Sequence, residues 1–181
     1  GENQHLAFEP PHWGEGATVG GTVACGLSGP RRFKVGAARD FVLGIELVDG
    51  RGQRIRAGGR VVKNVTGYDV SRALTGSFGT LGVLTEICLK LWPRPETQAT
   101  LVVDGCDRVD ALALMLAWAG LPLEITGLAY LPEGGSPVGR LLARIEGPEP
   151  AVTAQLRRLV EGTAGSISEF GEAESAHVWK Q

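Results

Sequence analysis

Two glycine-rich segments, 17–32 and 76–83, constrain the fold of this chain more than any other feature. The first reads ATVGGTVACGLSGPRR and the second GSFGTLGV. The chain holds 27 glycines in 181 residues, and they gather in such clusters without a fixed period. Glycine has no Cβ, so its backbone can approach a ligand or another backbone closely. The pattern predicts two tightly turned segments and excludes collagen-like and repeat architectures.

Composition and charge limit the class of protein. A hydrophobic content of 43% with 21% charged residues is typical of a globular chain. The formal net charge of -2 argues against nucleic-acid binding, which needs a basic face. The three cysteines are odd in number and lack CxxC spacing, which favours a reduced cytosolic setting and small buried side chains. The apolar run 111–123 is too short to span a membrane and is interpreted as a buried helix.

The first half of the chain is predicted to be rich in strands. Thr18 is expected to cap a short helix that the GLSGP sequence ends, and Asp69 to cap another. The turn Asp49–Gly52 lies between the apolar-rich run 41–48 and the run 53–57, which alternates polar and apolar residues, and this predicts a hairpin. The expected strands are 5–9, 41–48, 53–57 and 83–92, with 61–68 extended, and the expected helices are 18–24 and 70–74. Strand 83–92 has apolar residues on both faces, which predicts that it is largely buried.

A boundary is predicted at PRPE, residues 93–96, beyond which the pattern changes. Strands over 101–103, 124–130 and 141–145 and two helices follow in the order strand, helix, strand, strand, helix, which is the order of a ferredoxin-like module. The first helix follows Asp107 and Asp110 and ends at Gly120; the second begins at Pro150 and ends at Gly162. Their expected inward faces are Leu112, Met115, Leu116 and Ala119 in the first, and Val152, Leu156, Leu159 and Val160 in the second. The tail from Gly171 is expected to be loosely ordered, and the fold class is α+β.

The glycine segments could hold an anionic, flat group such as a dinucleotide. Backbone N–H groups bind pyrophosphate without a cationic side chain, and the hydroxyl of Thr18 or Ser28 could add a donor. Arg31, Arg32, Lys34 and Arg39 form a local basic cluster that could neutralise phosphate. The alternative is two ordinary glycine turns with solvated basic residues. The Rossmann fingerprint GxGxxG is absent from both segments.

Other candidate chemistry in the sequence is weak. His5, His12 and His177 lack the spacing of metal ligands, so no metal site is expected. Tyr68 and Asp69 could form an acid/base pair, but a helix-capping role for Asp69 is the preferred interpretation. No nucleophile–His arrangement is evident, and the catalytic residues stay unassigned.

Five sequence blocks in order resemble the second half of a known flavoprotein domain. They are TVGG, LSGPRR, GAARDFVLGIELVDGRG, VVKNVTGYD and GSFGTLGVLTE. Together they are similar to the FAD-binding domain of the vanillyl-alcohol oxidase type, also called the PCMH type. LAFEPP, LSGPRR and KNVTGYDVSR resemble, more closely, the FAD-containing accessory subunits of bacterial glycolate oxidases. The resemblance covers about residues 4–95, and the later module fits the start of the family's cap domain in outline.

The resemblance implies FAD as cofactor and two domains, 1–95 from the FAD-binding domain and 96–181 from the cap. It implies cofactor contacts from Thr18, Val19, Gly20, Gly21, Ser28, Gly29, Arg31, Gly79, Thr80, Leu81, Gly82 and Val83. The family's other phosphate loop, from its N-terminal subdomain, is not found, so the sequence is expected to be a fragment with weak or no FAD affinity alone. Phe78 stands where lactate-dehydrogenase-like members carry an acid in GSEGTLG, which puts a carboxylate role there in doubt.

The implied function is an FAD-binding subunit of a 2-hydroxy-acid (glycolate) oxidase complex. Electrons would pass from the substrate through the flavin to a flavin subunit and an iron–sulfur subunit. The expected location is the cytoplasm, with the partner subunits as a link to the inner face of the membrane. Two alternatives remain: a scaffold subunit that keeps the fold without flavin, and a PCMH-type FAD oxidoreductase for another substrate.

Overall fold

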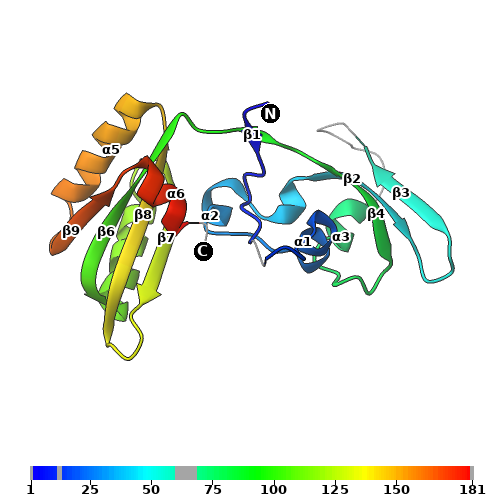
Figure 1. Ribbon diagram of the computed structural model, residues 1–181, viewed down its shortest axis with the longest axis horizontal. Helices are drawn as coiled ribbons and strands as arrows, with labels where there is room; N and C mark the ends of the chain where they lie inside the picture. The colour runs from blue at the N-terminus through cyan, green and yellow to red at the C-terminus, as the bar shows by residue number, and fades with distance from the viewer. Residues whose placement is uncertain (1, 12–13, 60–68, 180–181) are drawn as a thin grey trace. The chain divides into compact units, whose positions relative to one another are not determined.

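The computed structural model describes residues 2–11, 14–59 and 69–179 (Figure 1). The chain divides into two compact units, Gly1–Arg94 and Pro95–Gln181. Both units combine helices with antiparallel sheets, so the α+β class is confirmed. The sequence predictions for His12, Tyr68 and the extended run 61–68 lie outside the described residues. Within the described part, no helix has the length and apolar character that crossing a membrane requires.

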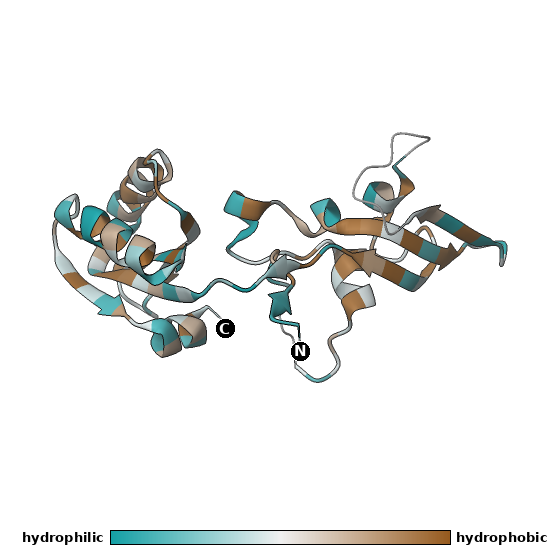
Figure 2. Ribbon diagram, turned by 90° about the horizontal axis from the view of Figure 1, so that it is seen from above, coloured by the Kyte–Doolittle hydropathy of each residue, from teal (hydrophilic) through white to brown (hydrophobic). Residues whose placement is uncertain are grey.

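The first unit is built around a three-stranded antiparallel sheet with the order β3-β2-β4. Its apolar residues appear as brown bands along the strands in Figure 2. The elements of this unit are β1 (Gln4–His5), α1 (Val19–Cys25), α2 (Arg32–Val35), the 3-10 helix η1 (Ala38–Asp40), β2 (Val42–Val48), β3 (Arg54–Gly58), α3 (Val70–Leu74), β4 (Val83–Leu89) and β5 (Trp92–Pro93). β1 and β5 form a separate antiparallel pair.

Two small cores hold the first unit. Ile45, Leu47 and Leu74 pack between the sheet and α3, and Phe8 and Phe41 meet in the other core with ring centroids 5.4 Å apart. The hairpin β2–β3 with its turn at Asp49–Gly52 is confirmed, as the Asp49 carboxylate accepts from the N–H groups of Arg51 and Gln53. The pattern of apolar and polar residues in the sequence therefore predicted these two strands correctly.

Two expectations for the first unit are wrong. The strand predicted over 5–9 is limited to Gln4–His5, and the chain then turns, with the Glu9 N–H donating to Leu6 O. β4 was expected to be largely buried, but every residue in it is exposed or half-buried. β4 pairs only with β2 among the described strands, and an edge strand keeps one side open to solvent.

The second unit is a four-stranded antiparallel sheet in the order β7-β8-β6-β9. Its core includes Leu101, Trp118, Leu141 and Leu159, which come from both the sheet and the helices α4 and α5. The elements are β6 (Thr97–Asp107), α4 (Arg108–Ala119), β7 (Ile125–Pro132), β8 (Val138–Gly147), α5 (Glu149–Glu161), β9 (Ser166–Phe170) and α6 (Glu172–Val178). The predicted strand, helix, strand, strand, helix order is confirmed, and β9 completes the ferredoxin-like pattern.

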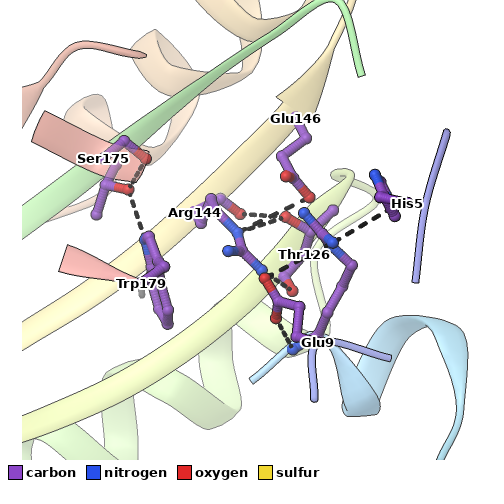
Figure 3. Close-up of polar contacts among 9 residues, drawn as sticks. His5, Glu9, Thr126, Arg144, Glu146, Ser175 and Trp179 are labelled. Atoms are coloured by element: carbon purple, nitrogen blue, oxygen red, sulfur yellow. Dashed lines mark hydrogen bonds and ion pairs between the residues drawn. The ribbon is translucent and has the colours of Figure 1, made fainter. Parts of the chain in front are cut away.

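The tail from Gly171, expected to be loosely ordered, forms α6 and packs against β6. Thr100 joins them: its Oγ1 lies 2.7 Å from the Ser175 Oγ and accepts from the Trp179 Nε1 at 2.8 Å. The guanidinium of buried Arg144 lies over the Trp179 ring, 4.7 Å from its centroid, and donates to Thr126 Oγ1 at 3.2 Å (Figure 3). These contacts join residues far apart in the sequence, so the polar sequence of the tail could not predict that it forms a docked helix.

Helix α4 departs from its expected orientation. Residues 111–123 were interpreted as a buried helix with Leu112 and Leu116 on its inward face. Those two leucines are 58% and 67% exposed, whereas Ala111 and Trp118 are the buried residues of the helix. α5 does bury the expected Val152, Leu156 and Leu159, although the helix begins at Glu149, one residue before Pro150.

Candidate cofactor site

The first glycine-rich segment folds as the local sequence predicts. The Thr18 Oγ1 accepts from the Gly21 N–H at 3.0 Å and so caps α1, because a hydroxyl at this position satisfies a free helix N–H. Gly26, with a φ of 67°, ends the helix in the left-handed conformation that glycine adopts without strain. Thr18 and Val19 at the start of α1 are exposed.

The second segment lies directly beside the first. The Gly76 N–H donates to Val23 O at 3.1 Å, and the Phe78 N–H donates to Ala24 O at 2.7 Å. A Cβ added to Gly26 would lie 3.1 Å from the Cα of Gly76. The close approach requires a residue without a side chain at Gly26, and Gly76 has a φ of 85°, which glycine adopts without strain.

The outer side of these two segments is open. A Cβ added at Gly76 or Gly79 would meet no heavy atom within 4 Å, and at Gly20 it would meet only Thr18 Oγ1 at 4.0 Å. Around this bare backbone the apolar side chains Val19, Phe78, Leu81 and Val83 are exposed by 50%, 73%, 56% and 70%. Exposed apolar groups gathered beside accessible peptide groups are typical of a binding surface.

A small apolar pocket adjoins the first turn of α1. Its volume is about 130 Å³, and the Thr18 and Val19 side chains form part of its wall. The other residues around it are Leu6, Phe8, Pro10, Pro11, Ala17 and Thr22. The N-terminal segment and α1 therefore form one concave surface with a hydroxyl at its edge.

Three of the expected cofactor residues, Ser28, Gly29 and Arg31, make contacts within the first unit. The Ser28 Oγ accepts from the Ala38 N–H at 2.9 Å. A Cβ on Gly29 would lie 2.6 Å from Glu9 O, so this glycine is needed for packing. Arg31 is 9% exposed; its N–H donates to Glu9 Oε2 at 2.8 Å, and its guanidinium lies 3.6 Å from Glu9 Oε1. Glu9 stands in the LAFEPP block but was not among the predicted site residues; it is labelled with His5 in Figure 3.

The residues expected from the second segment also divide into two groups. Thr80 Oγ1 donates to Ser77 O at 2.7 Å, and a Cβ on Gly82 would lie 2.6 Å from Leu47 Cδ1. Both therefore shape the turn into β4. Gly79, Leu81 and Val83 remain accessible, together with Thr18–Gly21 of the first segment.

The ionisable groups of this region give little support for acid/base chemistry. Asp69 caps α3 by accepting from the Arg72 N–H at 3.1 Å, which confirms its capping interpretation. The described residues contain no group of three or more His, Cys, Asp or Glu side chains that could hold a metal ion. The basic residues Arg32, Lys34 and Arg39 are exposed and could meet an anion. The geometry fits a flat apolar group joined to an anionic linker, held mainly by backbone.

Residues 2–58 match the family model described as FAD binding domain. The matched segment, about a third of the chain, is therefore similar to FAD-binding domains. The match includes α1 and Thr18–Gly21, where the open glycine backbone lies. FAD has a flat apolar ring system and a pyrophosphate linker, so it fits the surface described above.

Two curated relatives are similar to the chain. "Glycolate oxidase subunit GlcE" of Escherichia coli (strain K12) is 47% identical over 178 residues, which is 98% of this chain and 46% of that protein. "Glycolate oxidase subunit GlcD" of Bacillus subtilis (strain 168) is 43% identical over 62% of this chain and 24% of that protein. The chain thus spans less than half of the length of either relative.

Solved structures share the fold at low sequence identity. A glucooligosaccharide oxidase of Acremonium strictum matches with a TM-score of 0.72 at 16% identity, over 99% of this chain and 37% of that chain. An alkyldihydroxyacetonephosphate synthase matches with a TM-score of 0.66 at 20% identity, over 93% and 36%. At sequence identities this low, the structural similarity shows a shared fold alone.

Proposed function

We propose that this chain is part of an FAD-dependent 2-hydroxy-acid oxidase subunit of the glycolate oxidase kind. The observation that carries the proposal is the 47% identity with the GlcE subunit over 98% of the chain. The geometry supports it, because the bare backbone at Gly20 and Gly79 and the exposed Val19, Leu81 and Val83 suit a flat ring with an anionic linker. The first unit would be the second subdomain of the FAD-binding domain, and the second unit the start of the cap.

The chain's own residues would bind and shield the cofactor. FAD, when bound, supplies the electron acceptor for oxidation of a hydroxy acid to an oxo acid. The N–H groups of Val19 and Gly20 would contact its anionic linker, and the Val19, Leu81 and Val83 side chains would keep water from an apolar face. Arg31 would hold the segment in shape through Glu9, and no residue is assigned as a catalytic base.

The proposal includes partner subunits, because GlcE and GlcD are both named as subunits of a glycolate oxidase. Electrons would leave through a second flavin subunit and an iron–sulfur subunit. The complex would work in the cytoplasm, in keeping with the free thiols of Cys25, Cys88 and Cys106. Membrane contact, if the complex has it, would come from the partners.

The test uses the full-length protein and the substitution Gly20→Ala. Gly20 lies inside α1 and its Cβ position is open, so alanine should raise the free energy of unfolding by about 0.5–1 kcal/mol. The added methyl group would stand where the cofactor approaches, so the FAD dissociation constant should rise at least tenfold. Flavin fluorescence titration and denaturant unfolding measure the two effects.

Gly50→Ala is the matched control, because Gly50 is equally open but lies in the β2–β3 turn. It should leave FAD affinity unchanged. A full-length protein that is colourless and ignores added FAD would reject the proposal in favour of a scaffold subunit.

A second candidate substrate has its own support. A D-lactate dehydrogenase of Archaeoglobus fulgidus is 40% identical over 59% of this chain. Assays of the assembled complex with glycolate and D-lactate would distinguish the two: faster turnover of D-lactate would move the proposal to a PCMH-type oxidoreductase for that substrate.

A further inference from the structure

Helix α4 exposes an apolar face that the cofactor site does not use. Twelve large hydrophobic side chains are exposed among the described residues. They include Val109, Leu112 and Leu116 of α4, which are 76%, 58% and 67% exposed, and Leu121, two residues beyond the helix end, which is 41% exposed. Residues 109, 112 and 116 share one side of the helix by their spacing. A helix on a protein surface normally carries polar residues there. Helix α4 is apolar on both sides, and no residue that the structure describes covers its outer side.

The sequence of α4 makes the feature unusual. Residues 111–123, ALALMLAWAGLPL, contain no charged residue. The inner side is already filled, because Ala111 and Trp118 are 1% and 3% exposed in the core of the second unit. Packing against the sheet therefore does not account for the outer leucines, which would lower the solubility of a free protein.

The shape and size of the face indicate what could cover it. The four side chains together expose on the order of 400 Å² of apolar area, a patch of the size that marks an interaction surface. A convex helix cannot enclose a small molecule, so a macromolecule is required. The area is about half of one partner's share of a standard protein interface, which suits one contact within a larger assembly.

Charge decides between the possible macromolecules. From Asp104 to Glu124 the chain has four acids, Asp104, Asp107, Asp110 and Glu124, and one base, Arg108. Acids thus lie at both ends of the apolar face. A second copy in antiparallel packing would place Asp107 and Asp110 against the end that carries Glu124, and parallel packing would oppose identical acids. An anionic membrane surface would be repelled as well.

We propose that the outer face of α4 docks another protein subunit through an apolar helix whose ends carry Lys or Arg. The identity of the assembly, a hydroxy-acid oxidase complex, rests on the proposed function. The docking surface itself is defined by Val109, Leu112, Leu116 and Leu121. The apolar contact supplies affinity and the flanking acids select the partner.

The experiment reconstitutes the full-length protein with co-expressed flavin and iron–sulfur subunits from the same source. The variant Leu112→Gln/Leu116→Gln keeps good helix formers at both positions. It should weaken subunit association at least tenfold, while the flavin spectrum and the melting temperature of the free full-length protein stay unchanged. Asp110→Lys/Glu124→Lys should also weaken association and reduce its salt dependence. Ile55→Gln, an exposed apolar residue of the first unit, is the control and should change neither.

Hydrogen exchange of the α4 amides distinguishes another subunit from the other molecules or segments that could cover this face. Slower exchange of α4 only in the complex supports the proposal. Equal protection in the free monomer would show that the full-length chain covers the helix itself, and a free homodimer that the double Gln variant dissociates would show a second copy. Both results overturn the proposal. Three other results do so as well: unchanged exchange of α4 in the complex, failure of the subunits to assemble, and binding to lipid vesicles that depends on Leu112 and Leu116. A colourless protein would reject the proposed function alone, since the exchange readout needs no flavin.

Discussion

Phe78 is held in a conformation that suits glycine better than phenylalanine. Its φ is 54°, and its side chain is 73% exposed, so the ring gains little from packing. The left-handed conformation costs a residue with a Cβ roughly 1–2 kcal/mol. The backbone is kept there by the hydrogen bond from the Phe78 N–H to Ala24 O, which joins the two glycine-rich segments. Strained backbone of this kind is found at functional sites.

We therefore expect Phe78→Gly to stabilise the full-length protein by up to about 1 kcal/mol, because glycine adopts this φ without strain. Denaturant unfolding measures the change. Ser77→Gly is the matched control: Ser77 is not among the described residues with positive φ, so glycine there should cost about 0.5–1 kcal/mol. Destabilisation by Phe78→Gly would mean that the ring makes contacts of its own.

At the scale of elements, the hairpin β2–β3 and strand β4 are joined by a charge network on one face. The Arg54 Nη2 donates to Glu46 Oε1 at 2.9 Å, and Arg56 lies 3.2 Å from Glu46 Oε2 and 3.4 Å from Glu86 Oε2. The hydrogen bond from Arg54 is the main cause that lowers the pKa of Glu46; burial works in the opposite direction, and Thr85 and Arg56 add to the lowering. One carboxylate thus ties together three strands.

This network predicts a pH dependence of stability. A carboxyl group whose pKa is lower in the folded protein stabilises it above the unfolded pKa, about 4.3 for Glu, and the stabilisation is lost as the pH falls through the folded value. Unfolding measured from pH 6 to pH 3 should therefore show a steeper loss of stability for the natural protein than for Glu46→Gln. Arg54→Gln should reduce the slope similarly, whereas Arg51→Gln in the exposed turn should retain it. An equal slope in Glu46→Gln would contradict the assignment.

Local chemistry explains which elements could be predicted from the sequence. Thr18 and Asp69 cap helices because their side chains reach N–H groups three residues away, and Gly26 ends α1 through its own conformation. The burial of β4, the outward face of α4 and the docking of α6 depend on neighbours distant in the chain. The same holds for the candidate site: the open glycines were evident from the sequence, but the contacts of Glu9 with Gly29 and Arg31 were not.

At the scale of the whole molecule, each unit has its own hydrophobic core. The core of the second unit draws on β6, β7, β8 and both long helices, and all of these lie within Pro95–Gln181. A separate core is the condition for independent folding. The two hydrophobic clusters of the first unit share no residue with this core.

We expect a fragment of residues 95–181 to fold without the first unit. Its free energy of unfolding should be on the order of 5 kcal/mol, as for other domains of this size. Circular dichroism should show one cooperative transition, and Leu101→Ala should lower the free energy of unfolding by about 2–5 kcal/mol because Leu101 is fully buried. The exposed Leu116→Ala is the control, with a change below about 1 kcal/mol. A fragment without a cooperative transition would show that the two units depend on each other.

The near contact of Gly26 with Gly76 has a consequence for protein engineering. Consider a chimera that imports only one of the two glycine-rich segments from a distant flavoprotein. The backbone of the imported segment would have to fit against the native backbone of the other segment to within a few tenths of an ångström. The two segments therefore form a single transplantable cassette, and a graft that exchanges both together should succeed where a single exchange fails.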